Sequence, residues 1–301
     1  MPRTAPDFVI AGAPKCGTTS LHHWLNRHPA VHMLPGEPHY FSQDLAYNDP
    51  PMPAALYQAL IEASHPTKLC GERSTWYLYS RSAGEAIHAA NPDAKIIVLV
   101  RQPADMLNSV HSHYCQRGER ENEPDLLKAM ALEAERRRGR SLPERAGFPE
   151  KFYYSMLPDY ASGIRRLQAT FGIGRVKVVF FDDLKTNPQD VYAAVLDFLD
   201  IDNGFQPDFN VYNQATPLPD TLFRRLWRTG TWRYAIRHLR PEWWQRLHLR
   251  YKRQKRANVA ARHPRPPVSQ ETKNTITGRF EQQIADLEAL TGRNLSQWRV
   301  G

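Results

Sequence analysis

The sequence predicts an α/β fold, a doubly wound and mainly parallel sheet flanked by helices and carrying helical insertions. Three short apolar runs, each followed by a helix-forming stretch, carry this prediction: Phe8–Gly12, Ala94–Val100 and Arg175–Phe181. Strands that alternate with helices pair in parallel, because each helix returns the chain to the same edge of the sheet. With 301 residues the chain can bury a large core. We therefore expect a single domain over residues 1–301.

The first strand–helix unit is the most sharply marked. A helix from about Thr18 to Arg27 follows the strand Phe8–Gly12, and Pro29 lies just past its end, where a stop signal belongs. His22 and His23 fall on this helix, and we expect both on its surface.

The two later units follow the same pattern. Ala94–Val100 is a continuous run rich in β-branched residues, which is typical of a strand buried on both faces. Pro103 fits the first turn of the helix after it. Arg175–Phe181 leads to a helix that opens at Asn187-Pro188. Ligands of such sheets bind beyond the carboxyl ends of the strands, so the residues that follow these strands are the candidates for a site.

Three segments fall outside this alternation. Residues 122–150 are charged and without strands, which predicts a solvated helix followed by a loop, a lid or substrate-facing insertion. Residues 219–265 form a basic, aromatic helical segment. Residues 270–301 predict a C-terminal helix, breaking near Gly278, and a tail.

The formal net charge of +9 is concentrated in the basic segment. Between Asp220 and Arg265 there are 14 Lys and Arg residues against two acids, together with four tryptophans. This composition suits a solvated helical face with the tryptophans packed inward. It also suits a surface that contacts an acidic polymer or membrane headgroups, so a non-enzymatic binder stays an alternative function. The pattern matches no nucleic-acid module, and we expect no nucleic-acid partner.

Other compositional features narrow the class of protein. No apolar run approaches the roughly 20 residues of a membrane-spanning helix. The cysteines Cys16, Cys70 and Cys115 are scattered and odd in number, so they predict neither a disulfide framework nor a metal cluster. A reducing, cytoplasmic location is the expectation.

The turn after the first strand is a P-loop-like anion site. Gly12 and Gly17 have the separation of a phosphate-binding P-loop, but Thr18 stands where the loop lysine belongs, and the lysine is Lys15 instead. Backbone amides of such a turn point at an anion, and the dipole of the following helix adds positive potential. Thr19 adds a second hydroxyl beside that of Thr18.

The residues after the other two strands bear on which phosphate donor binds. A nucleotide kinase holds magnesium with an acid at a strand end. The second strand ends instead in Arg101, which, with Ser109 eight positions later, can hold a second phosphate of the same ligand. Asp182 and Asp183 follow the third strand and keep a P-loop nucleotide or small-molecule kinase open as an alternative.

Two phosphate sites of this kind describe 3′-phosphoadenosine 5′-phosphosulfate (PAPS), and here the sequence resembles the PAPS-dependent sulfotransferases. The similarity lies in four motifs, two of which resemble the glycosaminoglycan-type branch: PKCGTTSL at Pro14–Leu21, VLVRQPADMLNSVHSHY at Val98–Tyr114, GEPHYF at Gly36–Phe41 and GERSTWYL at Gly71–Leu78. The last two are those of the glycosaminoglycan-type branch.

The resemblance implies a function and a set of ligand-binding residues. PAPS would be the donor and 3′,5′-ADP the product, no metal would be required, and the acceptor would be a small molecule or glycan, with a sugar hydroxyl or amine of a carbohydrate or glycolipid favoured. The implied donor-binding residues are Pro14, Lys15, Cys16, Gly17, Thr18, Thr19, Ser20, Arg101 and Ser109.

Catalytic roles follow from the same resemblance. Lys15 would offset the charge that builds on the leaving phosphate. The base that takes the acceptor proton would be Glu37, with His39 as the chemical alternative because an imidazole generally titrates near neutral pH. Glu72, Arg73 and His111 are candidate acceptor-binding residues, although Glu72 and Arg73 could form an ion pair with each other and His111 could pack.

Some positions depart from the family pattern. Met106 occupies the place of a common second arginine, Gln102 replaces an Asn or Asp, and Gly36 stands where a lysine often precedes the glutamate. Arg262 or Arg265 would complete the 3′-phosphate contact. Cys16 is interpreted as a small loop filler, although a place beside Lys15 at a helix N-terminus can also lower the pKa of a thiol.

Overall fold

The computed structural model describes residues 3–45, 52–116, 121–143, 148–209 and 269–299. The chain divides into two units, and the first, Met1–Tyr212 with Pro267–Gly301, contains all of these residues. The basic segment of residues 219–265, with Arg262 and Arg265, lies outside the described residues, so the expectations for it stay predictions.

The described residues form one parallel sheet with helices around it. The strands are β1 (Phe8–Gly12), β2 (Val31–Met33), β3 (Leu69–Arg73), β4 (Lys95–Val100) and β5 (Val176–Phe180), in the order β2-β3-β1-β4-β5. The helices are α1 (Thr18–Leu25), α2 (Ala54–Glu62), α3 (Ala83–Ala90), α4 (Pro103–Gln116), α5 (Leu126–Ala131), α6 (Glu133–Arg137), α7 (Tyr160–Phe171), α8 (Phe181–Thr186), α9 (Pro188–Phe198), α13 (Gln270–Arg279), α14 (Glu281–Thr291) and α15 (Ser296–Arg299), with short 3₁₀ turns at Pro149–Phe152 and Ile173–Arg175.

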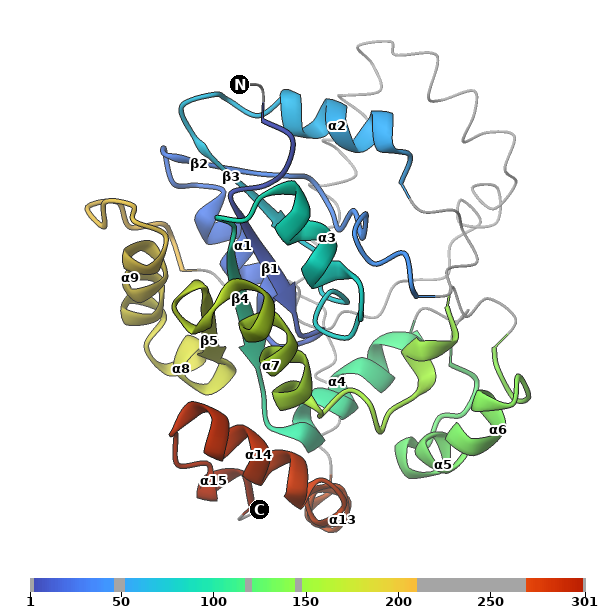
Figure 1. Cartoon of the computed structure of the whole chain (residues 1–301). Helices are drawn as coiled ribbons and strands as arrows, with labels where there is room; N and C mark the ends of the chain where they lie inside the picture. The colour runs from blue at the N-terminus through green and yellow to red at the C-terminus, as the bar shows by residue number, and fades with distance from the viewer. Residues whose placement is uncertain (1–2, 46–51, 117–120, 144–147, 210–268, 300–301) are drawn as a thin grey trace, which may run out of the picture. The chain divides into compact units, whose positions relative to one another are not determined.

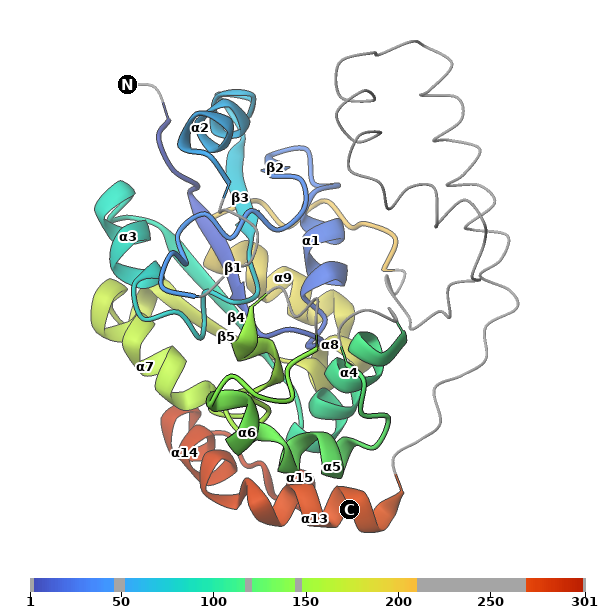
Figure 2. The ribbon, with the colours of Figure 1, turned by 90° about the vertical axis from the view of Figure 1, so that its right-hand side faces the viewer.

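Helices cover both faces of the sheet, as a doubly wound fold requires. The helices α3 and α7 lie on one face, and α1 and α9 on the other (Figures 1 and 2). All residues of the central strand β1 are buried, as are all but the first of β4, which explains their continuous apolar sequences. The predicted fold class is confirmed.

The sequence did not mark β2 and β3. Each is short, and β3 ends in the polar pair Glu72 and Arg73. Gly71 within β3 is required by packing, because a Cβ there would lie 2.3 Å from the Phe8 ring.

The insertion after α4 is less solvated than predicted. Arg136 on α6 and Glu121 are both fully buried and form a bidentate ion pair with N–O distances of 2.8 and 3.0 Å. Tyr154 donates a further hydrogen bond to Glu121. This buried pair fixes α6 to the body of the first unit, and removing one partner would leave the other charge buried and unpaired.

The C-terminal helices pack against two helices that lie between strands of the sheet in sequence. The helix α13 contacts α4, and α14 contacts α7 (Figure 1). The predicted break falls at Phe280, between α13 and α14, rather than at Gly278, which lies inside α13.

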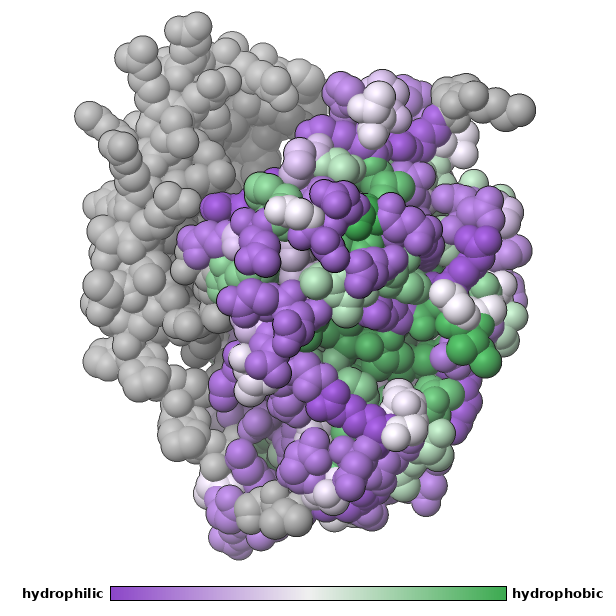
Figure 3. Space-filling model, turned by 90° about the vertical axis from the view of Figure 1, so that its left-hand side faces the viewer, coloured by the Kyte–Doolittle hydropathy of each residue, from purple (hydrophilic) through white to green (hydrophobic). Residues whose placement is uncertain are grey.

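The face of the described part that Figure 3 shows is mainly hydrophilic. Hydrophobic residues gather in a smaller area of that face. The large hydrophobic side chains exposed in the described ranges are Leu56 and Ile173. Within those ranges no helix combines the length and apolar character needed to cross a membrane.

Candidate active site

The predicted anion loop joins β1 to α1. Gly17 caps α1 with a φ of +92°, a left-handed conformation that favours glycine. A Cβ at this position would also lie 2.5 Å from Leu184 Cδ2 on α8. The loop is therefore closed tightly onto α8 and can take no larger residue here.

Lys15 and Arg101 lie beyond the carboxyl ends of strands, as predicted, and the two strands, β1 and β4, are neighbours in the sheet. Arg101 Nη1 donates a hydrogen bond to the Lys15 carbonyl at 3.3 Å, and the guanidinium lies 4.4 Å from the centre of the Phe181 ring. Arg101 Nε is buried and has no hydrogen-bond partner among the described residues. An unsatisfied buried N–H beside a second cation is what an anion site presents.

Buried side chains, among them Tyr160 of α7, pack against the rest of the loop. Cys16 is fully buried, its thiol lies 3.9 Å from the Tyr160 hydroxyl, and that hydroxyl donates to the Arg101 carbonyl. Burial raises the pKa of Cys16 to about 12, so a lowered pKa is wrong and the thiol is a filler. The Pro14 carbonyl accepts from the same thiol at 3.5 Å.

The hydroxyls of the donor side are mostly enclosed. Thr18 and Ser20 on α1, and Ser109 on α4, are buried. Thr19 accepts a hydrogen bond from Arg73 Nη1. Ser109 lies on the same side of α4 as Asp105, four residues earlier, and Asp105 is 3.9 Å from Arg101, which precedes the helix.

Glu37 is at the centre of a second group of side chains. Its carboxylate lies 3.3 Å from Arg73 Nη2 and 3.4 Å from His39 Nε2, and it accepts a hydrogen bond of 2.8 Å from Thr75. The two predicted candidates for the base, Glu37 and His39, are therefore in contact. Arg73 pairs with Glu37 and not with its neighbour Glu72.

This surrounding makes Glu37 a stable anion. Burial alone would raise the pKa of Glu37, but the hydrogen bond with His39 and the charge of Arg73 outweigh it and lower the pKa to about 2. Its side chain is 31% exposed, so an acceptor can reach a carboxylate that is ionised at any physiological pH.

Glu72, predicted to lie near the acceptor, is fully buried. It accepts hydrogen bonds from Tyr57, Tyr77 and Ser74 at 2.6, 2.6 and 2.7 Å. Burial raises its pKa above the ordinary value, against the effect of these donors. Glu72 has no exposed surface to offer to an acceptor in this structure.

The Glu72 group instead supports the loop that carries Glu37. Ser74 Oγ accepts a hydrogen bond from the His39 amide at 2.9 Å, and the Tyr77 hydroxyl accepts one from the Phe41 amide at 3.1 Å. Because Glu72 takes the protons of both hydroxyls, their lone pairs face the two amides. Glu72 is thus a positioning residue for the Glu37 loop.

Among the histidines considered from the sequence, His22 departs from expectation. His22 is buried, and burial lowers its pKa to about 3, so it is a neutral imidazole beside Arg73 and Glu37; its predicted surface position is wrong. His23 is exposed, as predicted. His111 is buried and its Nε2 lies 2.8 Å from the Glu123 carbonyl, so it packs within the insertion.

The acids that follow β5 are occupied by the C-terminal helices. Arg293 forms a bidentate ion pair with Asp183, and Trp298 Nε1 donates to Asp182 at 2.7 Å. The residues that a kinase would use to hold magnesium are thus engaged by protein side chains. Within the described ranges no three His, Cys, Asp or Glu side chains are grouped to hold a metal.

Gln102, a departure from the family pattern, also contacts this C-terminal region. Its Oε1 accepts from the Asp105 amide and so caps the start of α4, while its Nε2 lies 3.3 Å from Thr277 Oγ1 and from the Trp298 carbonyl. Sequence reasoning missed these contacts, since no local pattern signals pairing across about 175 residues.

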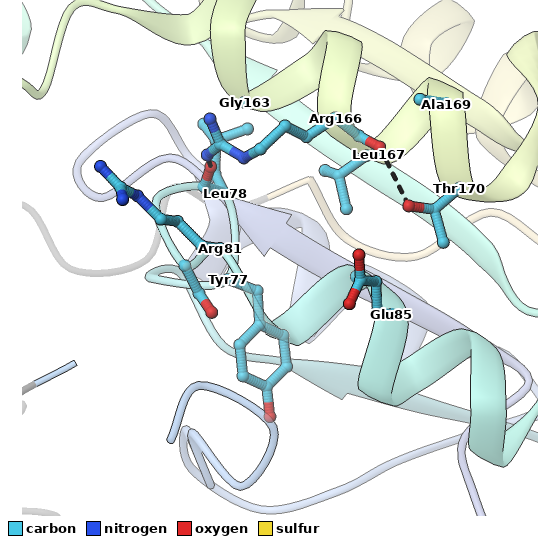
Figure 4. A pocket seen from close by; sticks show the side chains of 11 residues that line it. Tyr77, Leu78, Arg81, Glu85, Gly163, Arg166, Leu167, Ala169 and Thr170 are labelled. Carbon is cyan, nitrogen blue, oxygen red and sulfur yellow. Dashed lines mark hydrogen bonds between the residues drawn. The ribbon is translucent and has the colours of Figure 1, made fainter. Parts of the chain in front are cut away.

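A separate pocket of about 190 Å³ lies between α3, α7 and the segment after β3. Figure 4 shows Arg81 and Arg166 beside it, with Arg166 directed at the Leu78 carbonyl, to which it donates a hydrogen bond of 2.9 Å. The predicted donor-site residues do not line this pocket.

The comparisons with known proteins agree on one family. A model described as the sulfotransferase domain matches residues 5–208. Human heparan sulfate glucosamine 3-O-sulfotransferase 6 is 37% identical over 101 residues, which cover 34% of this chain and 28% of that protein. Human heparan sulfate glucosamine 3-O-sulfotransferase 5 is 26% identical over 212 residues, 70% of this chain and 58% of the relative. The chain thus spans less than two thirds of these curated relatives.

A solved structure extends the similarity over almost the whole chain. A sulfotransferase from Alicyclobacillus acidocaldarius superposes with a TM-score of 0.71 at 25% identity, and the match covers 98% of each chain.

Proposed function

Because the chain belongs to the sulfotransferase domain family, we propose that it is a sulfotransferase that moves the sulfuryl group of PAPS to a hydroxyl or amine of an acceptor. The transfer would be an in-line displacement that needs no metal ion. The product of the donor would be 3′,5′-ADP.

One observation carries the proposal more than any other. Arg73 contacts Glu37 with one guanidinium nitrogen and Thr19, in the first turn of α1, with another. An ionised carboxylate is thereby held beside the phosphate loop. A base next to an anion site is the arrangement that group transfer to an acceptor requires.

The residues present suit a donor with two phosphate groups. The loop amides and Lys15 would hold the phosphosulfate end, and Arg101 with Ser109 would hold the 3′-phosphate. The unsatisfied buried Nε atoms of Arg101 and Arg73 support this fit, because each lacks a hydrogen-bond partner among the described residues. When bound, the donor supplies an activated sulfuryl group.

The protein side chains would then orient, stabilise and remove a proton. Lys15 and the loop amides are fixed donors where negative charge builds on the leaving phosphate, a preorganised form of stabilisation. Glu37 Oε2 would accept the proton of the acceptor, and His39, 3.4 Å away, could share it. Arg73 keeps Glu37 ionised between turnovers.

A carbohydrate is the acceptor class we favour. The curated relatives are named for heparan sulfate glucosamine, and the motifs that contain Glu37 and Arg73 resemble the glycosaminoglycan-type branch. We propose a sugar hydroxyl or amine, in a polysaccharide or glycolipid.

The test combines ligand binding with transfer. Calorimetry should give tight binding of 3′,5′-ADP in the presence of a chelator, and no magnesium-dependent binding of ATP. Labelled PAPS, incubated with an extract of the source cells, should label a glycan that mass spectrometry can identify. Lys15→Ala should lower turnover by about 10²–10³-fold, while Lys128→Ala, at an exposed position on α5, should not. Magnesium-dependent ATP binding without 3′,5′-ADP binding would replace this proposal by the kinase.

Two further expectations stay proposals. Contact of the basic segment with a membrane surface or acidic polymer concerns residues outside the described ranges. The proposal of a cytoplasmic location rests on the three cysteines, Cys16, Cys70 and Cys115, which are all free thiols, as is usual in a reducing compartment.

A further inference from the structure

The helix α13 brings a second cation to the start of α4. Lys273 Nζ lies 3.3 Å from Asp105 Oδ1, and the other oxygen of the same carboxylate lies 3.9 Å from Arg101 Nη2. One aspartate thus stands between Arg101 and a lysine that is more than 150 residues away in sequence. No sequence motif marks Lys273.

The placement of Lys273 follows from helical spacing. Asp105 and Ser109 are four residues apart and share one side of α4, and Arg101, just before the helix, contacts Asp105. Lys273 contacts the middle of the three. On α13, Thr277 lies one turn after Lys273 and contacts Gln102 at 3.3 Å, so two contacts fix this face of α13 against α4. Lys273 therefore lies beside Asp105, which contacts Arg101 and is one helical turn before Ser109.

Among the described residues, the charges at this place are incomplete for a phosphate monoester. Such a group carries close to two negative charges at neutral pH. Arg101 and the Ser109 hydroxyl supply one positive charge, and Met106, where a second arginine is common in the family, is fully buried and apolar. The side chains of Lys273 and Asp105 are 33% and 38% exposed, so a ligand can reach both.

We infer that Lys273 is a further ligand of the 3′-phosphate, and that Asp105 occupies Arg101 and Lys273 until the phosphate replaces it. This inference rests on the proposed function, since it concerns the donor named there. A phosphate oxygen would form a charge-assisted hydrogen bond with Lys273 in place of the carboxylate.

The test compares two nucleotides that differ only in the 3′-phosphate. Binding of 3′,5′-ADP and of 5′-AMP is measured by calorimetry for the wild-type protein, Lys273→Met and Asp105→Asn. The control is Arg279→Met, an exposed position on the same helix. Lys273→Met should weaken 3′,5′-ADP binding about ten-fold and leave 5′-AMP unchanged. Asp105→Asn should tighten 3′,5′-ADP binding several-fold, because it removes a competing anion, and Arg279→Met should change neither.

Other results would overturn the inference. Equal weakening of both nucleotides by Lys273→Met, or no weakening, would mean that Lys273 does not contact the 3′-phosphate. Weaker 3′,5′-ADP binding in Asp105→Asn would mean that the aspartate positions the cations rather than competes for them. Lys273→Arg keeps the positive charge, so it should retain affinity for 3′,5′-ADP. Retained affinity would show that the weaker binding of Lys273→Met comes from the lost charge and not from a general defect of the fold. Failure of the wild-type protein to bind 3′,5′-ADP would instead remove the proposed function itself.

Discussion

Glu37 and Glu72 have the same carboxyl group and opposite surroundings. Glu37 is partly exposed and lies between Arg73 and His39, and its pKa falls to about 2. Glu72 is enclosed by three hydroxyl donors, and burial raises its pKa. Cations stabilise a charge that can still meet a ligand, whereas hydroxyls satisfy a buried group that orients its neighbours. One glutamate is suited to chemistry and the other to holding the first in place.

The sharpest test of this division is Glu37→Gln. We expect turnover to fall by about 10²–10⁴-fold, because an amide cannot accept the acceptor proton, while affinity for 3′,5′-ADP stays the same. Steady-state kinetics and calorimetry measure the two effects. Glu62→Gln, at an exposed position on α2, is the control. Unchanged turnover would remove Glu37 as the base and leave His39 to be tested.

Glu72→Gln should act through position and stability. An amide in the place of Glu72 turns an N–H toward hydroxyl donors and leaves at least one buried group unpaired, at a cost of about 1–3 kcal/mol. The melting temperature should fall by several degrees, and turnover by about ten-fold, as the Glu37 loop loosens.

A matched pair of variants separates the two effects of Glu72. Tyr57→Phe removes a donor to Glu72, but the loop amides of His39 and Phe41 donate to Ser74 and Tyr77 instead, so this variant should lower the melting temperature alone. Tyr77→Phe also removes the acceptor of the Phe41 amide and should lower turnover as well. Equal kinetics for the two variants would contradict the positioning role.

The pH dependence of kcat/KM distinguishes the two candidate bases. With a pKa of about 2, Glu37 stays ionised, so we expect no loss of activity on the acid side between about pH 8 and pH 5. Imidazoles generally titrate in that range. An acid limb near neutral pH that disappears in His39→Asn would assign the base to His39.

The smallest expected effect is on the pH dependence of folding stability, to which Glu37 and Glu72 contribute in opposite directions. Since the folded pKa of Glu37 lies below its ordinary value of 4.5, its contribution to stability is present above that pH and is lost as the pH falls toward 2. Glu72 has a raised pKa, so its contribution is present below 4.5 and is lost as the pH rises through the raised value. Urea unfolding of Glu37→Gln and Glu72→Gln against wild type should give opposite pH trends, and parallel trends would contradict the comparison.

Local sequence patterns predicted where the phosphate loop and Arg101 lie, but not how the residues around Glu37 are arranged. The strand Phe8–Gly12, the glycine turn and Arg101 follow one another in short windows whose apolar runs and turn residues are specific. β2 was not predicted because it has only three residues, and β3 because Gly71 and the charged pair Glu72 and Arg73 leave it without an apolar run. The pairing of Arg73 with Glu37 rather than Glu72 depends on which side of β3 each side chain faces, and β3 itself was not predicted.

Sequence patterns could not predict contacts between residues that are far apart in the chain. The burial of His22, and the contacts of Lys273 and Arg293, arise where elements far apart in sequence pack together. Periodicity describes one element at a time and carries no information on which charge will meet which.

The ion pair of Asp183 with Arg293 has a consequence for how the protein is made. During synthesis the phosphate loop is made early, and Arg293 is added 110 residues after Asp183, the aspartate that it binds. Until then Asp183, on the helix α8 against which Gly17 packs, lacks its ion-pair partner. The phosphate loop and α8 are therefore synthesised long before the residue that neutralises Asp183.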